Sequence, residues 1–215
     1  MTLSTEARTL WSAAIDLGRD AARVSPAGRP IPPLWFLTDP DRTPEPWRTA
    51  ARLPVGAGVI LRHFGRPQAE EWARRLRAAT AEAGVRLLVA ADPELARVVE
   101  ADGVHLPERL IEEAPAVRAQ NPRAFISAAC HDAAALRRAE SAGVDMALVS
   151  PVFPPGGGST GAPIGVSGLT VLARSIRLPV VALGGLAPEN VGRLKESGVS
   201  GIAGVDAFQR AFSAD

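Results

Sequence analysis

The sequence predicts one α/β domain, a (β/α)8 TIM barrel with an extra N-terminal helix. Short apolar runs rich in Val, Leu and Ile alternate with helical stretches rich in Ala, Arg and Glu, and this alternation recurs along the 215 residues. Strands that are apolar throughout are typical of a parallel sheet covered on both faces. The alternative, an open doubly wound sheet, normally has a glycine-rich turn after its first strand. Residues 38–42 (Thr-Asp-Pro-Asp-Arg) contain no glycine.

We expect strands at 34–38, 58–62, 86–90, 103–106, 124–128, 145–150, 179–183 and 200–203. Helices are expected at 44–52, 68–83, 93–100, 107–120, 132–142, 167–176, 188–197 and 206–212. Gly84, Gly143 and Gly198 each precede a valine where a helix gives way to a strand, which is typical of a left-handed helix end. Residues 6–22 have apolar residues at helical spacing. We therefore predict an N-terminal helical extension over 1–30, packed on or across the barrel bottom, and a single barrel domain over 31–215.

The composition limits the class of protein. With 24 Lys and Arg against 23 Asp and Glu, the net charge of +1 gives no basic surface for nucleic acid. No apolar run reaches the ~18 residues of a membrane span, and the first residues lack a signal-peptide pattern. The single cysteine, Cys130, excludes an internal disulfide, so we expect a cytoplasmic protein. The single lysine, Lys195, falls on the polar side of an expected helix, which disfavours Schiff-base chemistry.

Barrel enzymes carry their sites on the loops that follow the strands. All three histidines, His63, His105 and His131, fall at expected strand ends. Imidazole titrates near neutral pH and suits proton transfer. A single strand-end histidine is more often a hydrogen-bonded structural group, but the shared rim of the three strengthens the catalytic interpretation. No His-x-His or His-Glu-x-x-His spacing provides a ligand pair, so no metal site is expected from the histidines.

Glycines at the last two strands predict a phosphate site. Gly184 and Gly185 end the seventh strand, and Gly204 and Val205 follow the eighth. In these barrels the corresponding loops commonly hold phosphate, although glycine also serves close packing. The glycine-rich segment 154–165, which includes Gly157 and Gly165, is interpreted either as a lid over the ligand or as a flexible connection.

Several segments, taken in order, resemble the thiamine phosphate synthase/TenI family over roughly residues 34–210. They are Leu-Trp-Phe-Leu-Thr-Asp at 34–39, Ala-Asp-Gly-Val-His-Leu at 101–106, Ala-Gly-Val-Asp at 142–145, Pro-Val-Phe-Pro at 151–154, Gly-Val-Ser-Gly-Leu at 165–169 and Pro-Val-Val-Ala-Leu-Gly-Gly at 179–185. The resemblance implies a barrel that joins a pyrimidine methyl diphosphate to a thiazole phosphate with the help of Mg2+. Such a reaction needs metal and cations on the diphosphate leaving group.

The chain departs from the synthase pattern at the residues that this chemistry needs. Arg62 matches the family's arginine, but Phe64 stands where the resemblance implies a diphosphate-binding lysine. Asp92 matches one metal carboxylate, whereas Leu110 stands at the place of the second. The phosphate-site serine is replaced by Asp206, an anion expected to repel phosphate.

The TenI branch of the family lacks the same machinery, and the resemblance implies a thiazole tautomerase that moves a proton with the histidine matching His131. We therefore predict a TenI-like protein that binds a thiazole phosphate or a related small molecule, with His131 catalytic and no cofactor. The alternatives are a working synthase, which would need Mg2+, and a non-catalytic ligand-binding protein. Self-association into a homo-oligomer stays open. The expected substrate-binding residues are Arg62, His63, Asp92, His105, Phe153, Gly157, Gly165, Gly184, Gly185, Gly204, Val205 and Asp206.

Overall fold

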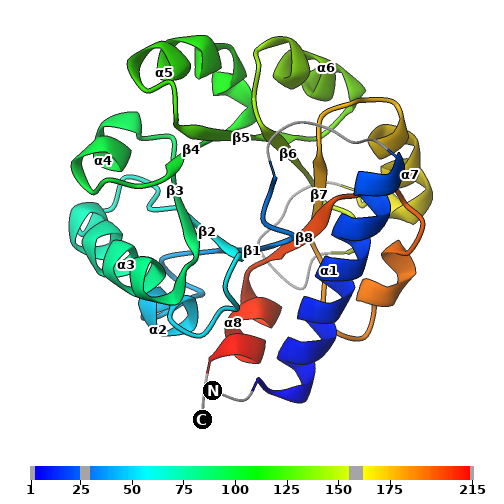
Figure 1. Ribbon diagram of the computed structural model, residues 1–215, viewed down its shortest axis with the longest axis horizontal. Coiled ribbons are helices and arrows are strands. Elements are labelled where there is room, and N and C mark those ends of the chain that lie inside the picture. The colour runs from blue at the N-terminus through cyan, green and yellow to red at the C-terminus, as the bar shows by residue number, and fades with distance from the viewer. Residues whose placement is uncertain (1–2, 25–29, 155–161, 214–215) are drawn as a thin grey trace.

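The computed structural model describes residues 3–24, 30–154 and 162–213, and it confirms the TIM barrel (Figure 1). Eight parallel strands pair in chain order, and β1 pairs with β8 to close the barrel. The strands are β1 Leu34–Leu37, β2 Gly58–Leu61, β3 Arg86–Ala90, β4 Gly103–Leu106, β5 Phe125–Cys130, β6 Met146–Val149, β7 Val180–Leu183 and β8 Gly201–Gly204. Each expected strand is present, with its ends shifted by at most two residues.

Helices surround the barrel. They are α1 Thr5–Val24, α2 Pro46–Ala50, α3 Ala69–Ala83, α4 Pro93–Val98, α5 Ala114–Gln120, α6 Ala133–Ser141, α7 Gly165–Arg174 and α8 Asp206–Phe212, with 3-10 helices η1 Glu108–Glu113 and η2 Val191–Leu194. The helix expected at 107–120 is divided into η1 and α5, with Pro115 in the first turn of α5. The helix expected at 188–197 is only the short η2, because Lys195 leaves the helical conformation and Glu196 has a φ of 64°. None of the helices in the described ranges is long and apolar enough to cross a membrane.

The expected N-terminal helix is present as α1, which lies beside α8 and η2 against β1 and β8 (Figure 1). Its buried residues Ala7, Leu10, Ala14 and Leu17 belong to the same hydrophobic core as the barrel wall. A Cβ on Gly18 would lie 3.4 Å from the carbonyl oxygen of Ser200, just before β8. Since η2 is short, the apolar face of α1 covers β1 and β8 near their amino ends.

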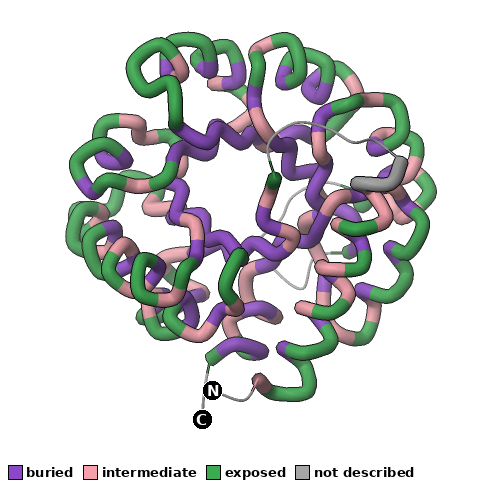
Figure 2. The backbone as a smooth tube through the Cα atoms, viewed as in Figure 1, coloured by how far each residue is buried: buried purple, intermediate pink, exposed green. Residues whose placement is uncertain are grey.

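Two layers of buried side chains hold the barrel together. Figure 2 shows that the strands of the barrel wall are formed largely by buried residues. The outer layer lies between strands and helices, and the inner layer fills the barrel. Inside, the rings of Trp35 and Phe125 stack with centroids 6.0 Å apart, and a Cβ on Gly58 would overlap the Trp35 indole. These residues lie at or near the starts of their strands, so the barrel interior is filled at its amino end, and enzymes of this fold carry their sites at the carboxyl end.

Candidate active site

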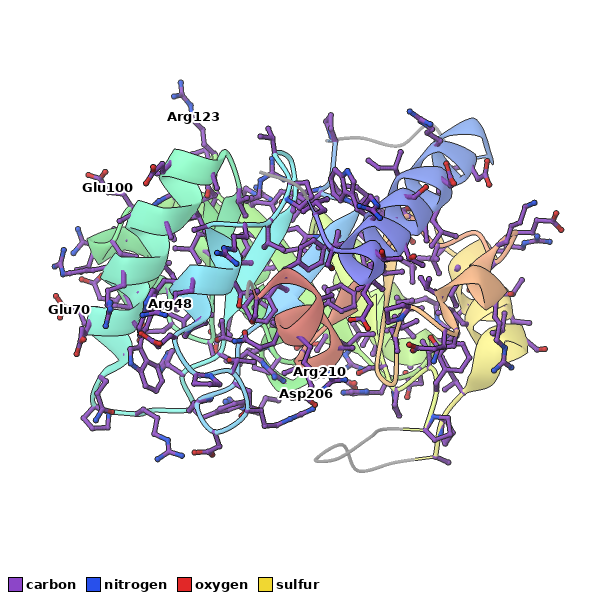
Figure 3. All side chains as sticks on the ribbon, turned by 90° about the horizontal axis from the view of Figure 1, so that it is seen from below. Arg48, Glu70, Glu100, Arg123, Asp206 and Arg210 are labelled. Carbon is purple, nitrogen blue, oxygen red and sulfur yellow. The ribbon has the colours of Figure 1, made fainter. Side chains whose placement is uncertain are left out.

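A cavity of about 390 Å³ opens among residues that follow β1, β2, β6, β7 and β8. Figure 3 shows Asp206 and Arg210 at one end of the barrel and Arg123, which precedes β5, at the other. Six residues predicted to bind substrate line this cavity: Arg62, Gly184, Gly185, Gly204, Val205 and Asp206. The remaining wall is formed by Arg42, Ser150, Pro154, Leu183, Leu186, Ala187, Ala207 and Arg210.

The wall at β7 needs glycine for both conformation and space. Gly184 and Gly185 have φ angles of 99° and 65°, which other residues rarely adopt. A Cβ on Gly184 would lie 2.8 Å from the Cα of Pro151, and one on Gly185 would lie 2.6 Å from the carbonyl oxygen of Pro154. The glycines therefore allow the end of β7 to pack against the segment after β6. Gly184 and Gly185 thus serve close packing and also line the cavity, so the two roles considered from the sequence are compatible.

Arg62 is a fixed cation in the cavity wall. Its Nε donates to the carbonyl oxygen of Thr38 over 2.7 Å, and its Nη2 lies 3.5 Å from Oδ2 of Asp39. Its backbone N–H donates to Oγ1 of Thr38 over 3.0 Å. Burial lowers the pKa of Arg62, and the Asp39 carboxylate opposes that shift. A guanidinium starts from a pKa so high that Arg62 stays charged at neutral pH.

Asp206, at the start of α8, is paired with an arginine that the sequence analysis did not single out. Arg42 Nε donates to Oδ1 of Asp206 over 3.0 Å, and Arg42 Nη2 donates to Oδ2. The hydrogen bond to Asp206 raises the pKa of Arg42. The expected repulsion of phosphate is therefore offset, since Arg42, Arg62 and Arg210 face one carboxylate in the wall. The sequence signal for Arg42 was its place in the loop after the first strand, where barrel sites are built.

His131 directly follows β5 and is exposed at the edge of the site. Its Nδ1 lies 2.7 Å from the carbonyl oxygen of Ser150, which lines the cavity. A carbonyl oxygen only accepts hydrogen bonds, so Nδ1 of His131 is the donor in this contact, and Nε2 is the ring nitrogen that can accept a proton. The backbone carbonyl just after β6 thus favours the tautomer of His131 that a general base requires.

His63 and Asp92 lie together but do not line the cavity. Oδ1 of Asp92 caps α4 by accepting from the backbone N–H of Leu95 over 2.8 Å. Oδ2 of Asp92 lies 3.7 Å from Nε2 of His63, which is buried without a hydrogen bond. Nδ1 of His63 accepts from the backbone N–H of Gly65 over 3.2 Å. The pair forms a second polar cluster, after β2 and β3.

His105 and Phe153 are both buried away from the cavity lining. The His105 side chain is inside the barrel, 6% exposed, with Nδ1 2.9 Å from Oγ of Ser127. Burial, aided by the charge of Arg62, lowers the pKa of His105 to about 3, so the ring is neutral at physiological pH. Phe153 packs behind Gly185 with the Arg193 guanidinium 4.9 Å from its ring centroid. Gly165 begins α7, and Gly157 lies outside the described residues.

The residues present do not fit the Mg2+ that the synthase resemblance implies. Mg2+ prefers several oxygen ligands in octahedral geometry. Within ranges 3–24, 30–154 and 162–213, no three His, Cys, Asp or Glu side chains gather as ligands. Asp92 offers one oxygen to its own helix cap, and its other oxygen faces an imidazole. We therefore derive no step through a metal.

Comparison with known proteins gives a consistent set of relatives. Residues 41–208 match the family model described as thiamine monophosphate synthase. The chain is 30% identical to the thiamine-phosphate synthase of Chlorobium luteolum, covering 85% of this chain and 87% of that protein. It is 30% identical to the thiamine-phosphate synthase of Moorella thermoacetica, with 72% and 76% covered. Among solved structures, thiamine phosphate pyrophosphorylase from Pyrococcus furiosus superposes with a TM-score of 0.71 at 27% identity, covering 84% of this chain and 91% of that one.

Proposed function

Because this chain belongs to the thiamine monophosphate synthase/TenI family, we propose that it binds a thiazole phosphate in the cavity after β7 and β8 and that His131 moves a proton on the bound ring. The observation that carries this proposal is the 2.7 Å contact between Nδ1 of His131 and the carbonyl oxygen of Ser150. It prepares Nε2 as a base beside a residue that lines the cavity.

The cavity supplies the binding energy for the phosphate. Arg42, Arg62 and Arg210 outnumber Asp206 by two charges among the lining residues, and Asp39, which pairs with Arg62, reduces the excess of positive charge to one. A phosphomonoester carries close to two negative charges near neutral pH, so this excess attracts it. Guanidinium groups bind phosphate oxygens with paired, charge-assisted hydrogen bonds.

The proposed reaction is an isomerisation. Nε2 of His131 accepts a proton from one atom of the thiazole ring, and the imidazolium delivers a proton to another atom of the same ligand. The Nδ1–H bond to the Ser150 carbonyl oxygen stabilises the positive charge while it exists. Atoms and charge balance without a metal or a second substrate. His105 takes no part, because its side chain is buried away from the cavity and its pKa, lowered to about 3 by burial, makes it a poor proton acceptor.

A synthase activity is the second candidate, since the relatives at 30% identity are named thiamine-phosphate synthases. Arg62 and Asp92 would have to hold a metal-diphosphate unit between them, and one of the two Asp92 carboxylate oxygens already accepts the hydrogen bond that caps α4. The donor set therefore favours proton transfer over ionisation of a diphosphate ester.

Proton NMR of the thiazole phosphate tautomer, first with the purified protein and then with pyrimidine diphosphate and Mg2+ added, separates these candidates. Faster conversion to the aromatic thiazole in the first stage is the expected result. Thiamine phosphate formed only in the second stage would instead establish a synthase. Binding without turnover at either stage would identify a ligand-binding protein with no enzymatic activity.

A further inference from the structure

Phe64 is the one exposed aromatic residue in the described part of the chain. Its relative exposure is 67%, whereas the other residues among the 4 tryptophans and 6 phenylalanines are buried or half-buried. The residue follows β2 by three positions, so it stands on the same rim as the cavity. An exposed aromatic ring gains little from folding, and single exposed apolar residues are common, so a role for Phe64 has to be argued from its backbone and its neighbours.

The backbone at Phe64 is unfavourable for a large side chain. The N–H of Arg66 donates to the carbonyl oxygen of His63 over 2.9 Å, and Phe64 and Gly65 have φ angles of 47° and 71°. This is a type I′ turn, whose first central position favours Asn, Asp or Gly. A residue with a bulky Cβ substituent loses free energy in this left-handed conformation. Residues held in such conformations cluster at ligand-binding sites.

Neighbouring contacts hold the turn in place. Arg66 Nη2 donates to both carboxylate oxygens of Asp41, over 2.7 and 2.9 Å, which ties the turn to the loop after β1. The Gly65 N–H donates to Nδ1 of His63 within the turn. The turn that carries the Phe64 ring is therefore held by hydrogen bonds and an ion pair, which fixes the position of its backbone.

The ring also stands next to the cavity. The guanidinium carbon of Arg62 lies 5.4 Å from the Phe64 ring centroid, and Arg62 itself lines the cavity. A cation–π contact with so exposed a ring is weak, so it does not by itself explain the position. A flat apolar surface beside a fixed cation matches a ligand that joins a planar ring to an anionic group.

We propose that Phe64 is a specificity-determining residue whose ring stacks on the planar ring of the ligand, while the ligand's anionic group lies among the cavity arginines. The identity of that ring as a thiazole rests on the proposed function. Whatever the identity of the ring, the site selects aromatic phosphates over aliphatic phosphates. Phenylalanine adds no charge, so the same position favours a ring over a second phosphate group.

Isothermal titration calorimetry with four probes tests this: inorganic phosphate, ethyl phosphate, phenylethyl phosphate and the thiazole phosphate. The native protein is expected to bind the two ring-bearing phosphates about tenfold more tightly than ethyl phosphate, the size expected for one aromatic stacking contact. Phe64→Ala is expected to remove that difference and to leave the affinity for inorganic phosphate within about twofold. Phe64→Trp is expected to retain it.

Two further variants keep the test clear of folding effects. Phe64→Asn places a favoured residue in the turn, so it is expected to raise the Tm by about 2–4 °C while weakening binding of the ring-bearing phosphates. Val55→Ala removes an apolar side chain that is even more exposed, at 78%, from the loop before β2 at the other end of the barrel. It is expected to leave all four affinities unchanged.

The outcomes separate the two proposals. Equal weakening of all four probes by Phe64→Ala would overturn the stacking role, as would a native protein that binds ethyl phosphate as tightly as the ring-bearing phosphates. If phenylethyl phosphate and the thiazole phosphate bind alike, both depend on Phe64, and no tautomer is converted, the stacking role stands and the proposed tautomerase falls.

Discussion

Arg42 and Asp206 form a two-bonded ion pair that joins the loop after β1 to the start of α8, 164 residues away in the chain. One of these bonds, from Nε to Oδ1, is 3.0 Å long. Both residues line the cavity. The carboxylate holds the arginine in the wall and competes for it with any anionic ligand.

Replacing Asp206 by Asn should strengthen phosphate binding. The change keeps the shape of the side chain but removes the charge that competes for Arg42, so we expect the affinity for inorganic phosphate and for the thiazole phosphate to rise about tenfold. Asp16→Asn removes the same charge from the exposed face of α1 and is the matched control. Calorimetric titration measures both. A weaker affinity in Asp206→Asn would mean that the carboxylate helps binding by holding Arg42 in the wall more than it hinders binding by competing for it.

Replacing His131 should abolish proton transfer with little effect on binding. His131→Ala removes the base, and His131→Asn keeps a donor for the Ser150 carbonyl oxygen but cannot take up a proton. We expect both variants to lower tautomer turnover by about 10²- to 10⁴-fold, measured by NMR, and to bind the thiazole phosphate within about threefold of the native protein. Turnover that survives in His131→Asn would show that the base is another group.

Stability should decrease as the pH falls below about 6.5, because His105 is buried as a neutral ring. Its pKa is about 3 in the folded protein against 6.5 for an imidazole in water, so the unfolded chain binds more protons between these values. The contribution is complete above pH 6.5 and is lost progressively toward pH 3. We expect the free energy of unfolding of His105→Gln to change less with pH than that of the native protein.

Urea unfolding between pH 5 and 7 measures this difference in slope while most carboxylates stay ionised. His63 and His131 are present in both proteins, so the comparison isolates the effect of His105. Parallel stability curves for the native protein and His105→Gln would contradict the assignment to His105.

A methyl group on Gly58 should destabilise the barrel. The new Cβ would overlap the Trp35 indole in the inner layer, and crowding of this kind costs about 1–3 kcal/mol. Gly192→Ala in η2 is the matched control, because nothing lies within 4 Å of its Cβ position. We expect that variant to change stability by less than about 1 kcal/mol. Urea midpoints compare the two, and equal midpoints would show that Trp35 moves aside freely.

The barrel architecture could be predicted from the sequence because each strand is a short apolar run between helices. β3 and β4 have the predicted bounds. β5 extends beyond the expected end at 128 because Ala129 and Cys130 pair with Leu148 and Val149 of β6. That extension depends on the neighbouring strand, which local sequence does not reveal.

The candidate site could be predicted only in part from the sequence. Arg62, Gly184, Gly185 and Gly204 could be placed on the rim, because parallel strands end at the same edge. His105 was expected to line the pocket, yet its side chain is inside the barrel beside Ser127. Alternate residues of a strand face opposite sides, but which of them reaches the rim depends on strand tilt and stagger.

By itself, then, the sequence determined the eight-strand alternation, the N-terminal helix and the rim that carries the polar residues, since these follow from local patterns of apolar and turn-forming residues. Only the tertiary structure decided which charges meet. Arg42 reaches Asp206 because β1 pairs with β8, and His131 reaches the Ser150 carbonyl because β5 pairs with β6. Closing the barrel brings together loops that are distant in the chain, so the pairing that sets the charge and the tautomer of the site exists only in the folded protein.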